Sequence, residues 1–595
     1  MPFTCPSYVA PLAFEPPDSI PIYEFLFDRS GEYGHLNQAS LRPPFRCGLT
    51  GKAYQTGEVV ERIERLAAAV AAELGVGVGG NELDKVVAIF CVNTIDTMTV
   101  SWATHRLGGV SAPISPSYSA PELARQLKAI RAKALFTCVP LLHVALEAAR
   151  QAGIPKQHVY LLAVPPQMLK EDAPATTDLK TVDELIAQRA EALDKLQWCA
   201  GQGARQVAFL CSSSGTSGVP KNVMISHRNV IANVLQVATF ESTNGASEPL
   251  GNLGVLPLSH CYALIITGHL GVYRGHEVVV LPEFEINQVF KTIAQYRLEI
   301  LWMVPAMIIG MLKAASIASK YDLGCIKTVT AGASNMDKDM AQQFATLVPN
   351  CDFVPGYGLT EAAVAVSWQN RQDILFGSSG SLLPGYEARL LDASGCDIET
   401  YNTPGELLLK SPTIVLGYLN DEEATREAMT EDKWLRTGDL VEIRKSEKGH
   451  EHIFIVDRIK ELIKVRGLQV SPVQLESLLL RHASVSEACV VPIPHDTAGE
   501  LPFAFVVQTP AAAASLSQSQ LSDSLHDFVA AHLAEYKRLA GGIQFVDALP
   551  KSAAGKTRRA ELRSRAEAVY HGNKTRAIST VLETFEFDDS DEDEE

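Results

Sequence analysis

The sequence lacks a membrane span, a Cys-x-x-Cys pair and an excess of basic residues. Its 595 residues include 52 lysines and arginines against 69 aspartates and glutamates, a net charge of −17, whereas nucleic acid or an anionic membrane requires a basic face. The eleven cysteines sit mostly in apolar runs and favour a reducing compartment. The start Met1-Pro-Phe-Thr lacks the segments of a signal peptide, and the C-terminus is not Ser-Lys-Leu-like. We expect a cytoplasmic protein with no nucleic-acid partner and no membrane span.

Length and residue pattern predict several domains of α/β type. A chain of 64.5 kDa is larger than a typical domain with a single hydrophobic core. Apolar runs alternate with helical segments and lie at 86–92, 134–138, 159–164, 206–211, 276–281, 299–303, 327–330 and 352–354. Nearly unbroken apolar strands separated by helices are typical of parallel sheets that are covered on both faces.

The pattern changes twice in the second half of the chain. After Asp392, glycines and prolines punctuate shorter strands, which indicates a β-rich subdomain. Ser471-Pro472-Val473-Gln474 has the pattern of a capping box that begins a helix. We expect a large multi-subdomain N-terminal domain (1–457) with mostly parallel sheets, a small α+β C-terminal domain (458–570) and a disordered acidic tail (571–595). The low-complexity stretch 511–520 is expected to be a surface loop.

Glycines at 75, 77 and 80 match the spacing of the dinucleotide-binding fingerprint, but their context does not fit it. The fingerprint follows a strand and opens a helix, whereas Val59, Ile63, Leu66 and Val70 recur at helical spacing before these glycines. We therefore interpret the segment as the end of a helix.

The stretch Phe209-Leu-Cys-Ser-Ser-Ser-Gly-Thr-Ser-Gly-Val-Pro-Lys221 is the most informative part of the chain. Its backbone N–H groups, hydroxyls and lysine can surround an anion, although a Ser/Gly cluster alone is more often an ordinary turn. It is not a Walker loop, because Val219 and Pro220 separate Gly218 from Lys221. It resembles the phosphate loop of the adenylate-forming superfamily, which contains acyl-CoA synthetases, 4-coumarate–CoA ligases and peptide-synthetase adenylation domains. The resemblance implies ATP at Ser213, Ser214, Gly215, Thr216, Ser217, Gly218 and Lys221.

Gly356-Tyr-Gly-Leu-Thr-Glu361 resembles the second motif of that superfamily. The resemblance implies that Tyr357 stacks on adenine, that Thr360 meets the α-phosphate and that Glu361 holds Mg²⁺. A π face, a hydroxyl and a hard oxygen ligand suit those partners. Gly356 and Ala333 are expected to complete this side of the nucleotide site.

Later motifs follow in the family's order. By resemblance, Asp439 and Arg458 contact the ribose, Lys460 is the hinge, and Lys464 and Gln469 reach the adenylate. Arg466 and Gly467 would line the thiol tunnel. Leu549-Pro-Lys-Ser-Ala-Ala-Gly-Lys-Thr-Arg-Arg559 makes Lys556 the catalytic lysine of adenylation, a cation aimed at the charge that develops on the α-phosphate.

The substrate pocket is less well defined. His260, Tyr262, Ile266, Gly332, Ala333 and Gly356 would line it by analogy, with His260 as a catalytic gate. Largely apolar walls suit an aryl, arylpropenoic or medium-chain acid. Histidine stands at 260, near the position where amino-acid-activating relatives carry an aspartate, which disfavours an α-amino acid.

The resemblance predicts an AMP-forming acid–thiol ligase that uses ATP, Mg²⁺ and coenzyme A and passes through an acyl-adenylate. One alternative keeps adenylation but loads a separate carrier protein. A second is an inactive nucleotide-binding regulator, which the intact Lys221, Glu361, Asp439 and Lys556 disfavour. A third is luciferase-like oxygenation, which the motifs do not distinguish.

Overall fold

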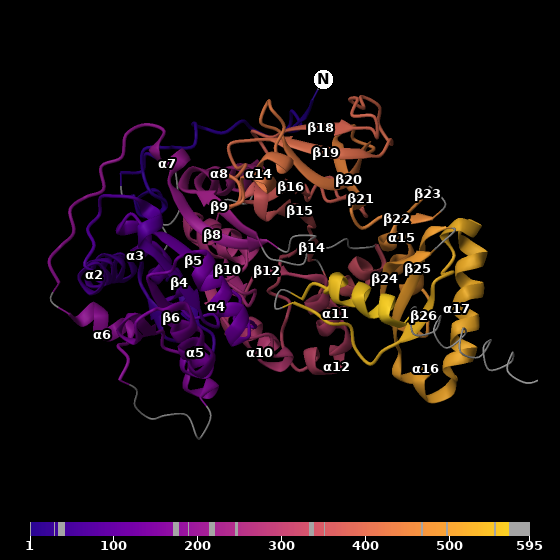
Figure 1. Cartoon of the computed structure of the whole chain (residues 1–595), viewed down its shortest axis with the longest axis horizontal. Helices are drawn as coiled ribbons and strands as arrows, with labels where there is room; N and C mark the ends of the chain where they lie inside the picture. The colour runs from indigo at the N-terminus through magenta and orange to yellow at the C-terminus, as the bar shows by residue number, and fades with distance from the viewer. Residues whose placement is uncertain are drawn as a thin grey trace, which may run out of the picture. The chain divides into compact units, whose positions relative to one another are not determined.

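The computed structural model of the chain (Figure 1) describes residues 2–28, 30–33, 42–169, 178–188, 190–213, 221–243, 245, 248–332, 338–349, 351–465, 468–495, 498–552 and 555–569. The chain divides into two compact units. The first comprises Met1–Thr437, Val441–Ile455 and Ala553–Gly555, and the second comprises Gly438–Leu440, Val456–Ser552 and Lys556–Glu595.

A six-stranded sheet forms the N-terminal part of the first unit. Its order is β7 (Val159–Leu161), β6 (Ala134–Thr137), β4 (Val86–Phe90), β5 (Val110–Ile114), β8 (Val207–Ser213) and β9 (Lys221–Ser226). All neighbours are parallel except β8 and β9. The predicted parallel strands are confirmed here.

Helices cover both faces of this sheet (Figure 1). In β4, Val86, Ala88 and Phe90 pack with α4 (Ala120–Ala129) and α5 (Leu142–Ala152). Val87 and Ile89 pack with α2 (Thr56–Leu74), α3 (Thr97–Arg106) and α6 (Val182–Ala187). Because successive side chains of a strand point to opposite faces, a strand buried on both sides is apolar throughout.

A seven-stranded sheet forms the second layer of the first unit. Its order is β14 (Asp352–Phe353), β13 (Thr328–Ala331), β12 (Ile300–Met303), β10 (Gly251–Gly254), β11 (Glu277–Val280), β2 (Phe45–Cys47) and β3 (Ala53–Tyr54), and only β2 and β3 are antiparallel. One core joins this sheet to α10 (Ile286–Tyr296), α11 (Pro305–Lys313), α12 (Ala315–Ala318) and α13 (Lys338–Leu347). The other core joins it to α8 (His227–Thr243) and the π-helix η5 (Ala263–Leu270).

Shorter antiparallel strands follow, which confirms the predicted β-rich subdomain. A five-stranded sheet has the order β1 (Phe3–Thr4), β18 (Glu387–Leu391), β19 (Gly405–Lys410), β20 (Leu435–Lys445) and β21 (Glu451–Arg458). A three-stranded sheet contains β15 (Gly356–Leu359), β16 (Val364–Trp368) and β17 (Ser381–Leu382). The remaining α-helices of this unit are short: α1 (Ile22–Phe27), α7 (Gln202–Arg205), α9 (Gly271–Tyr273) and α14 (Glu422–Ala428).

The second unit is the expected α+β fold. Its sheet has the order β23 (Leu468–Val470), β22 (Ile463–Val465), β25 (Gly499–Gln508) and β24 (Val485–His495), with β26 (Gly542–Phe545) beside β25. The side chain of Ser471 accepts a hydrogen bond from the Gln474 N–H and so caps α15 (Pro472–Leu480). Lys537 Nζ donates to the side chain of Gln474 at 2.8 Å, so only the serine half of the predicted capping box forms.

The prediction of a surface loop at 511–520 is wrong. Helix α16 (Pro510–Ser515) occupies half of the stretch, and α17 (Gln518–His532) begins within it. Thr509 caps α16 with proline at the first helical position, and Ser517 forms a capping box with Gln520. Alanine is the strongest helix former, so these caps and the alanine run outweigh low complexity.

The glycine segment after α2 ends that helix, as expected. Gly75 adopts the left-handed conformation, with φ 65°. The buried Lys85 Nζ donates to the carbonyl oxygens of Gly77, Val78, Gly79 and Leu107 at 3.0–3.1 Å. This segment therefore binds an ammonium group of its own chain.

Across the described part of the chain, no helix combines the length and apolar character needed to cross a membrane.

Candidate active site

The predicted phosphate loop connects two antiparallel strands. β8 ends at Ser213 and β9 begins at Lys221, and these two residues are paired in register. Lys221 therefore lies directly opposite Ser213, the last residue of β8. Ser214, Gly215, Thr216, Ser217 and Gly218 lie outside the described residues.

Tyr418 joins Lys221 to the second motif. Lys221 Nζ lies 5.0 Å from the centre of the Tyr418 ring, and the Tyr418 hydroxyl donates to Glu361 Oε1 at 3.0 Å. Burial and the Glu361 carboxylate raise the pKa of Tyr418, which keeps the phenol protonated as a donor. Asp421 Oδ2 is 3.8 Å from Lys221 Nζ. The Tyr418 side chain thus contacts both the proposed phosphate-binding lysine and the proposed metal ligand.

The second motif forms a tight hairpin. β15 runs into a 3₁₀ turn, Thr360–Ala362, and returns as β16. A Cβ on Gly358 would lie 1.7 Å from the carbonyl oxygen of Val364, so only glycine fits there. Val364 itself has a φ of 92°, an outlier for a β-branched residue. Asn233 of α8 bonds both the N–H and the carbonyl of Ala365 and so holds the turn.

Cys261 contacts the threonine of this motif. Its Sγ is 3.2 Å from Thr360 Oγ1, and burial raises the pKa of the Cys261 thiol to about 11. The thiol is therefore protonated at neutral pH. Next to it, the N–H of Tyr262 donates to His260 Nδ1 at 3.2 Å, which assigns the proton of a neutral His260 to Nε2.

Two of the predicted pocket residues, Tyr262 and Gly332, pack against each other. A Cβ at Gly332 would lie 3.3 Å from the Tyr262 ring, and the Tyr262 hydroxyl donates to the Thr330 carbonyl at 3.4 Å. Ile266 is fully buried within η5. Gly356 and Tyr357 are half-buried in β15, and Ala333 lies outside the described residues.

The two predicted ribose ligands pair with each other in the second unit. Arg458 Nε is 3.4 Å from Asp439 Oδ1, and the Asp439 side chain is 6% exposed. Lys460 is exposed in the turn after β21. Lys464 and Gln469 are register partners in the β22–β23 hairpin. Arg466 and Gly467, between these strands, lie outside the described residues.

Lys556 belongs to the second unit and closes a hydrogen-bonded turn with Ser552 of the same unit. Ser552 N–H donates to the Lys556 carbonyl at 2.8 Å, and Lys556 N–H donates to Ser552 Oγ at 3.2 Å. Its side chain is accessible to water, yet desolvation by the surrounding protein lowers the pKa of Lys556 to about 8. Arg458 lowers this pKa further, and Glu461 and Asp439 raise it.

Glu361 is the carboxylate predicted to hold the magnesium ion. Within the described ranges, no three His, Cys, Asp or Glu side chains form a group that could hold a metal. Magnesium in nucleotide sites is typically held by one or two carboxylates together with the phosphates. Glu361 therefore fits Mg²⁺ that arrives with ATP.

Sequence reasoning missed Tyr418 and Cys261. Tyr418 bonds to Glu361, 57 positions away, and Cys261 contacts Thr360, 99 positions away. Tyr418 follows Gly417, whose φ is 125° in the structure. In the sequence, an aromatic residue after a glycine is too weak a pattern to identify a functional tyrosine by itself.

Comparison with known proteins agrees with these motifs. The AMP-binding enzyme family matches residues 45–419, and the AMP-binding enzyme C-terminal domain matches residues 474–556. An acyl-CoA ligase of Emericella nidulans is 38% identical over 95% of this chain and 100% of its own length. One from Purpureocillium lilacinum is 50% identical over 58% of this chain and 88% of its own. The crystal structure of ATP-bound MatB from Rhodopseudomonas palustris has the same fold, with a TM-score of 0.77 and 22% identity over 93% of this chain and all of that one.

The chain belongs to the AMP-binding enzyme family, and its resemblance to the adenylate-forming superfamily is confirmed. The prediction of an enzyme of the AMP-forming acid–thiol ligase class is confirmed with it.

Proposed function

We propose that this enzyme activates a carboxylic acid with ATP and transfers the acyl group to coenzyme A. The observation that carries the proposal is the cluster in the first unit in which Tyr418 connects Lys221 to Glu361 while Cys261 contacts Thr360. A cation, a hydroxyl and a carboxylate are thereby brought together, and these groups suit the phosphates and the metal ion of a nucleoside triphosphate. The names of the fungal relatives support the acid and the thiol.

In the first half-reaction, a carboxylate oxygen of the acid attacks the α-phosphorus of ATP. A new phosphorus–oxygen bond forms, the bond to the bridging oxygen breaks, and pyrophosphate leaves. Lys221 and the loop Ser213–Gly218 bind the phosphates, and Thr360 donates to the α-phosphate. When bound at Glu361, Mg²⁺ neutralises the charge on the phosphates. Tyr357, Gly356 and Ala333 position the adenine.

The second unit contributes charged groups to both half-reactions. Asp439 and Arg458 hold the ribose, while Lys464 and Gln469 contact the adenylate. Lys556 places its ammonium between the carboxylate and the α-phosphate, where negative charge accumulates. The unit then turns about Lys460, and the thiol enters along Arg466 and Gly467. The thiol loses its proton to solvent, and its sulfur attacks the acyl carbonyl. A carbon–sulfur bond forms, and AMP leaves with the electrons of the carbon–oxygen bond.

The acid belongs to the aryl, arylpropenoic or medium-chain class. Tyr262 packed on Gly332 and the buried Ile266 provide apolar walls. Such walls bind an apolar acyl group and leave orientation to a few polar atoms. His260, whose Nδ1 is already engaged by a backbone N–H, presents Nε2 as its donor and acts as the gate.

The test is pyrophosphate release with ATP, Mg²⁺ and a panel of aryl and fatty acids, each with and without coenzyme A. Acid-dependent turnover that yields a thioester only with coenzyme A supports the proposal. Release that stops after about one equivalent in both conditions would indicate a carrier protein as acceptor. No release with any acid, alongside ATP binding, would instead favour an inactive regulator.

Lys556→Ala tests the assigned catalytic lysine. We expect pyrophosphate release to fall on the order of 10²–10³-fold, as for the loss of other preorganised donors. Lys551→Ala is the matched control, because Lys551 lies in the same loop but pairs with Glu487 at 2.7 Å. Equal losses in both variants would contradict the assignment.

A further inference from the structure

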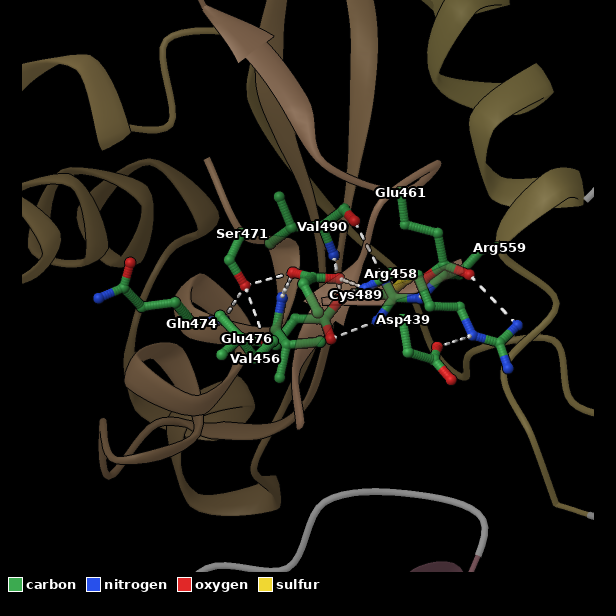
Figure 2. Close-up of polar contacts among 12 residues, drawn as sticks. Asp439, Val456, Arg458, Glu461, Ser471, Gln474, Glu476, Cys489, Val490 and Arg559 are labelled. Atoms are coloured by element: carbon green, nitrogen blue, oxygen red, sulfur yellow. Dashed lines mark hydrogen bonds and ion pairs between the residues drawn. The ribbon is translucent and has the colours of Figure 1, made fainter. Parts of the chain in front are cut away.

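Five charged side chains of the second unit form a continuous chain of ion pairs (Figure 2). Its order is Asp439, Arg458, Glu461, Arg559 and Glu476. The separations are 3.4 Å for Arg458 Nε to Asp439 Oδ1, 4.0 Å for Arg458 Nη1 to Glu461 Oε1 and 3.2 Å for Arg559 Nε to Glu461 Oε2. Glu461 is therefore the carboxylate that both arginines share.

The Arg559 end of the chain is tightly held. Arg559 makes two parallel hydrogen bonds of 2.6 Å to the carboxylate of Glu476, and its Nη1 donates to the Val490 carbonyl at 3.0 Å. A bidentate arginine–carboxylate pair fixes both distance and direction. Glu476 lies on α15 and its side chain is 13% exposed, so this end is anchored to the core of the unit.

The Arg458 end is more exposed. Its ion pairs with Asp439 and Glu461 are longer than those of Arg559 with Glu476, and the Arg458 side chain is 38% exposed. Glu461 thus connects a residue proposed to bind ribose to an anchored arginine. Figure 2 shows Arg458 between the carboxylates of Asp439 and Glu461.

Arg559 also ends the turn that carries Lys556. Lys551 and Thr557 form an antiparallel bridge across this turn, and the Arg559 N–H donates to the Thr557 carbonyl at 3.1 Å. The bridge and the anchored arginine fix the backbone on both sides of Lys556. The charged groups that act on its ammonium are Arg458, Glu461, Asp439 and Arg559.

We propose that Glu461 is a positioning residue for the adenylation half-reaction, because it holds Arg458 and the Lys556 turn in a fixed relation and offsets the positive charge gathered there. This inference rests on the proposed function. Three cations, Arg458, Lys556 and Arg559, repel one another unless a carboxylate lies among them. Asp439 and Glu476 each contact one of the arginines, whereas Glu461 contacts both.

Removing the charge of Glu461 should change the pH dependence of pyrophosphate release. Glu461→Gln keeps the shape of the side chain but removes its negative charge, so the pKa of Lys556 should fall below its value of about 8. In a plot of the pyrophosphate release rate against pH, the decline at high pH (the alkaline limb) should then shift to lower pH by roughly half a unit to one unit. We expect the rate of pyrophosphate release at neutral pH to fall about tenfold, because Arg458 loses the carboxylate of Glu461. Glu461→Asp should restore part of both effects.

The experiment compares wild type, Glu461→Gln, Glu461→Asp and the control Glu487→Gln. Glu487 lies on β24 and pairs with Lys551 of the same turn at 2.7 Å, and it is not among the groups with the largest effect on the pKa of Lys556. Acid-dependent pyrophosphate release is measured from pH 6.5 to 9.5. Thioester formation from a synthetic acyl-adenylate and coenzyme A is measured in parallel. The inference predicts that pyrophosphate release declines at a lower pH in Glu461→Gln only. The thioester step, which does not use Lys556, should show no such shift.

Three outcomes would overturn the inference. One is a Glu461→Gln profile that superimposes on that of wild type. Another is equal loss in both half-reactions with a lowered melting temperature, which would make Glu461 merely structural. The third is a wild type that releases no pyrophosphate with any acid. That result removes the proposed function and this inference together, and the wild-type arm distinguishes it from the other two.

Discussion

Tyr418→Phe is the sharpest test of how the first unit holds its phosphate site. The substitution removes the hydroxyl that donates to Glu361 Oε1 at 3.0 Å but keeps the ring below Lys221, 5.0 Å from its Nζ. A hydrogen bond to a charged group contributes about 1.5–3 kcal/mol. Because this bond is only partly buried, we take the lower end of that range. It corresponds to about a tenfold loss in the rate of pyrophosphate release.

The loss should appear in the magnesium dependence. Without the hydroxyl, the Glu361 carboxylate is no longer oriented, so half-maximal pyrophosphate release should require more Mg²⁺ at a fixed ATP concentration. Tyr401→Phe is the control, since the Tyr401 hydroxyl makes the same kind of bond, 2.6 Å to Glu451 Oε1. If Tyr418→Phe matches wild type in rate and magnesium dependence, the positioning argument is refuted.

Two further predictions concern the first unit. Gly358→Ala should abolish activity, because its Cβ would overlap the Val364 carbonyl, whereas Gly77→Ala, with open space around its Cβ, should remain active in the same assay. Burial lowers the pKa of His105 to about 3, below about 6.5 in the unfolded chain. As the pH falls below 6.5, only the unfolded state binds this proton, so the free energy of unfolding should drop by about 1.4 kcal/mol per pH unit. Urea unfolding of wild type and His105→Gln at several pH values measures that slope, and identical slopes would contradict the assignment.

Local sequence predicted most of the elements because their causes are local. Strand β4 could be recognised from residues 86–92, since burial on both faces requires an unbroken apolar run. Ser471 and Pro472 marked the start of α15, and Gly75 marked the end of α2. The error at 511–520 arose where composition was weighed above caps and helix propensity, which are also local.

The motif residues were predictable as types but not as a cluster. The order of Lys221, Glu361 and Lys556 along the chain identifies the family, because each chemical role requires one kind of side chain. Which neighbours orient those side chains depends on packing between segments far apart in sequence. Their roles in catalysis remain predictions for the variants above.

Sequence by itself determined the class of enzyme, the parallel sheets and the positions of the motifs. Only tertiary structure decided that Tyr418 bridges Lys221 and Glu361, that Cys261 contacts Thr360 and that Glu461 is shared by two arginines. A hydrogen bond or ion pair depends on distances of a few ångströms between side chains. Those distances are set by how strands and helices pack, and a linear pattern does not specify them.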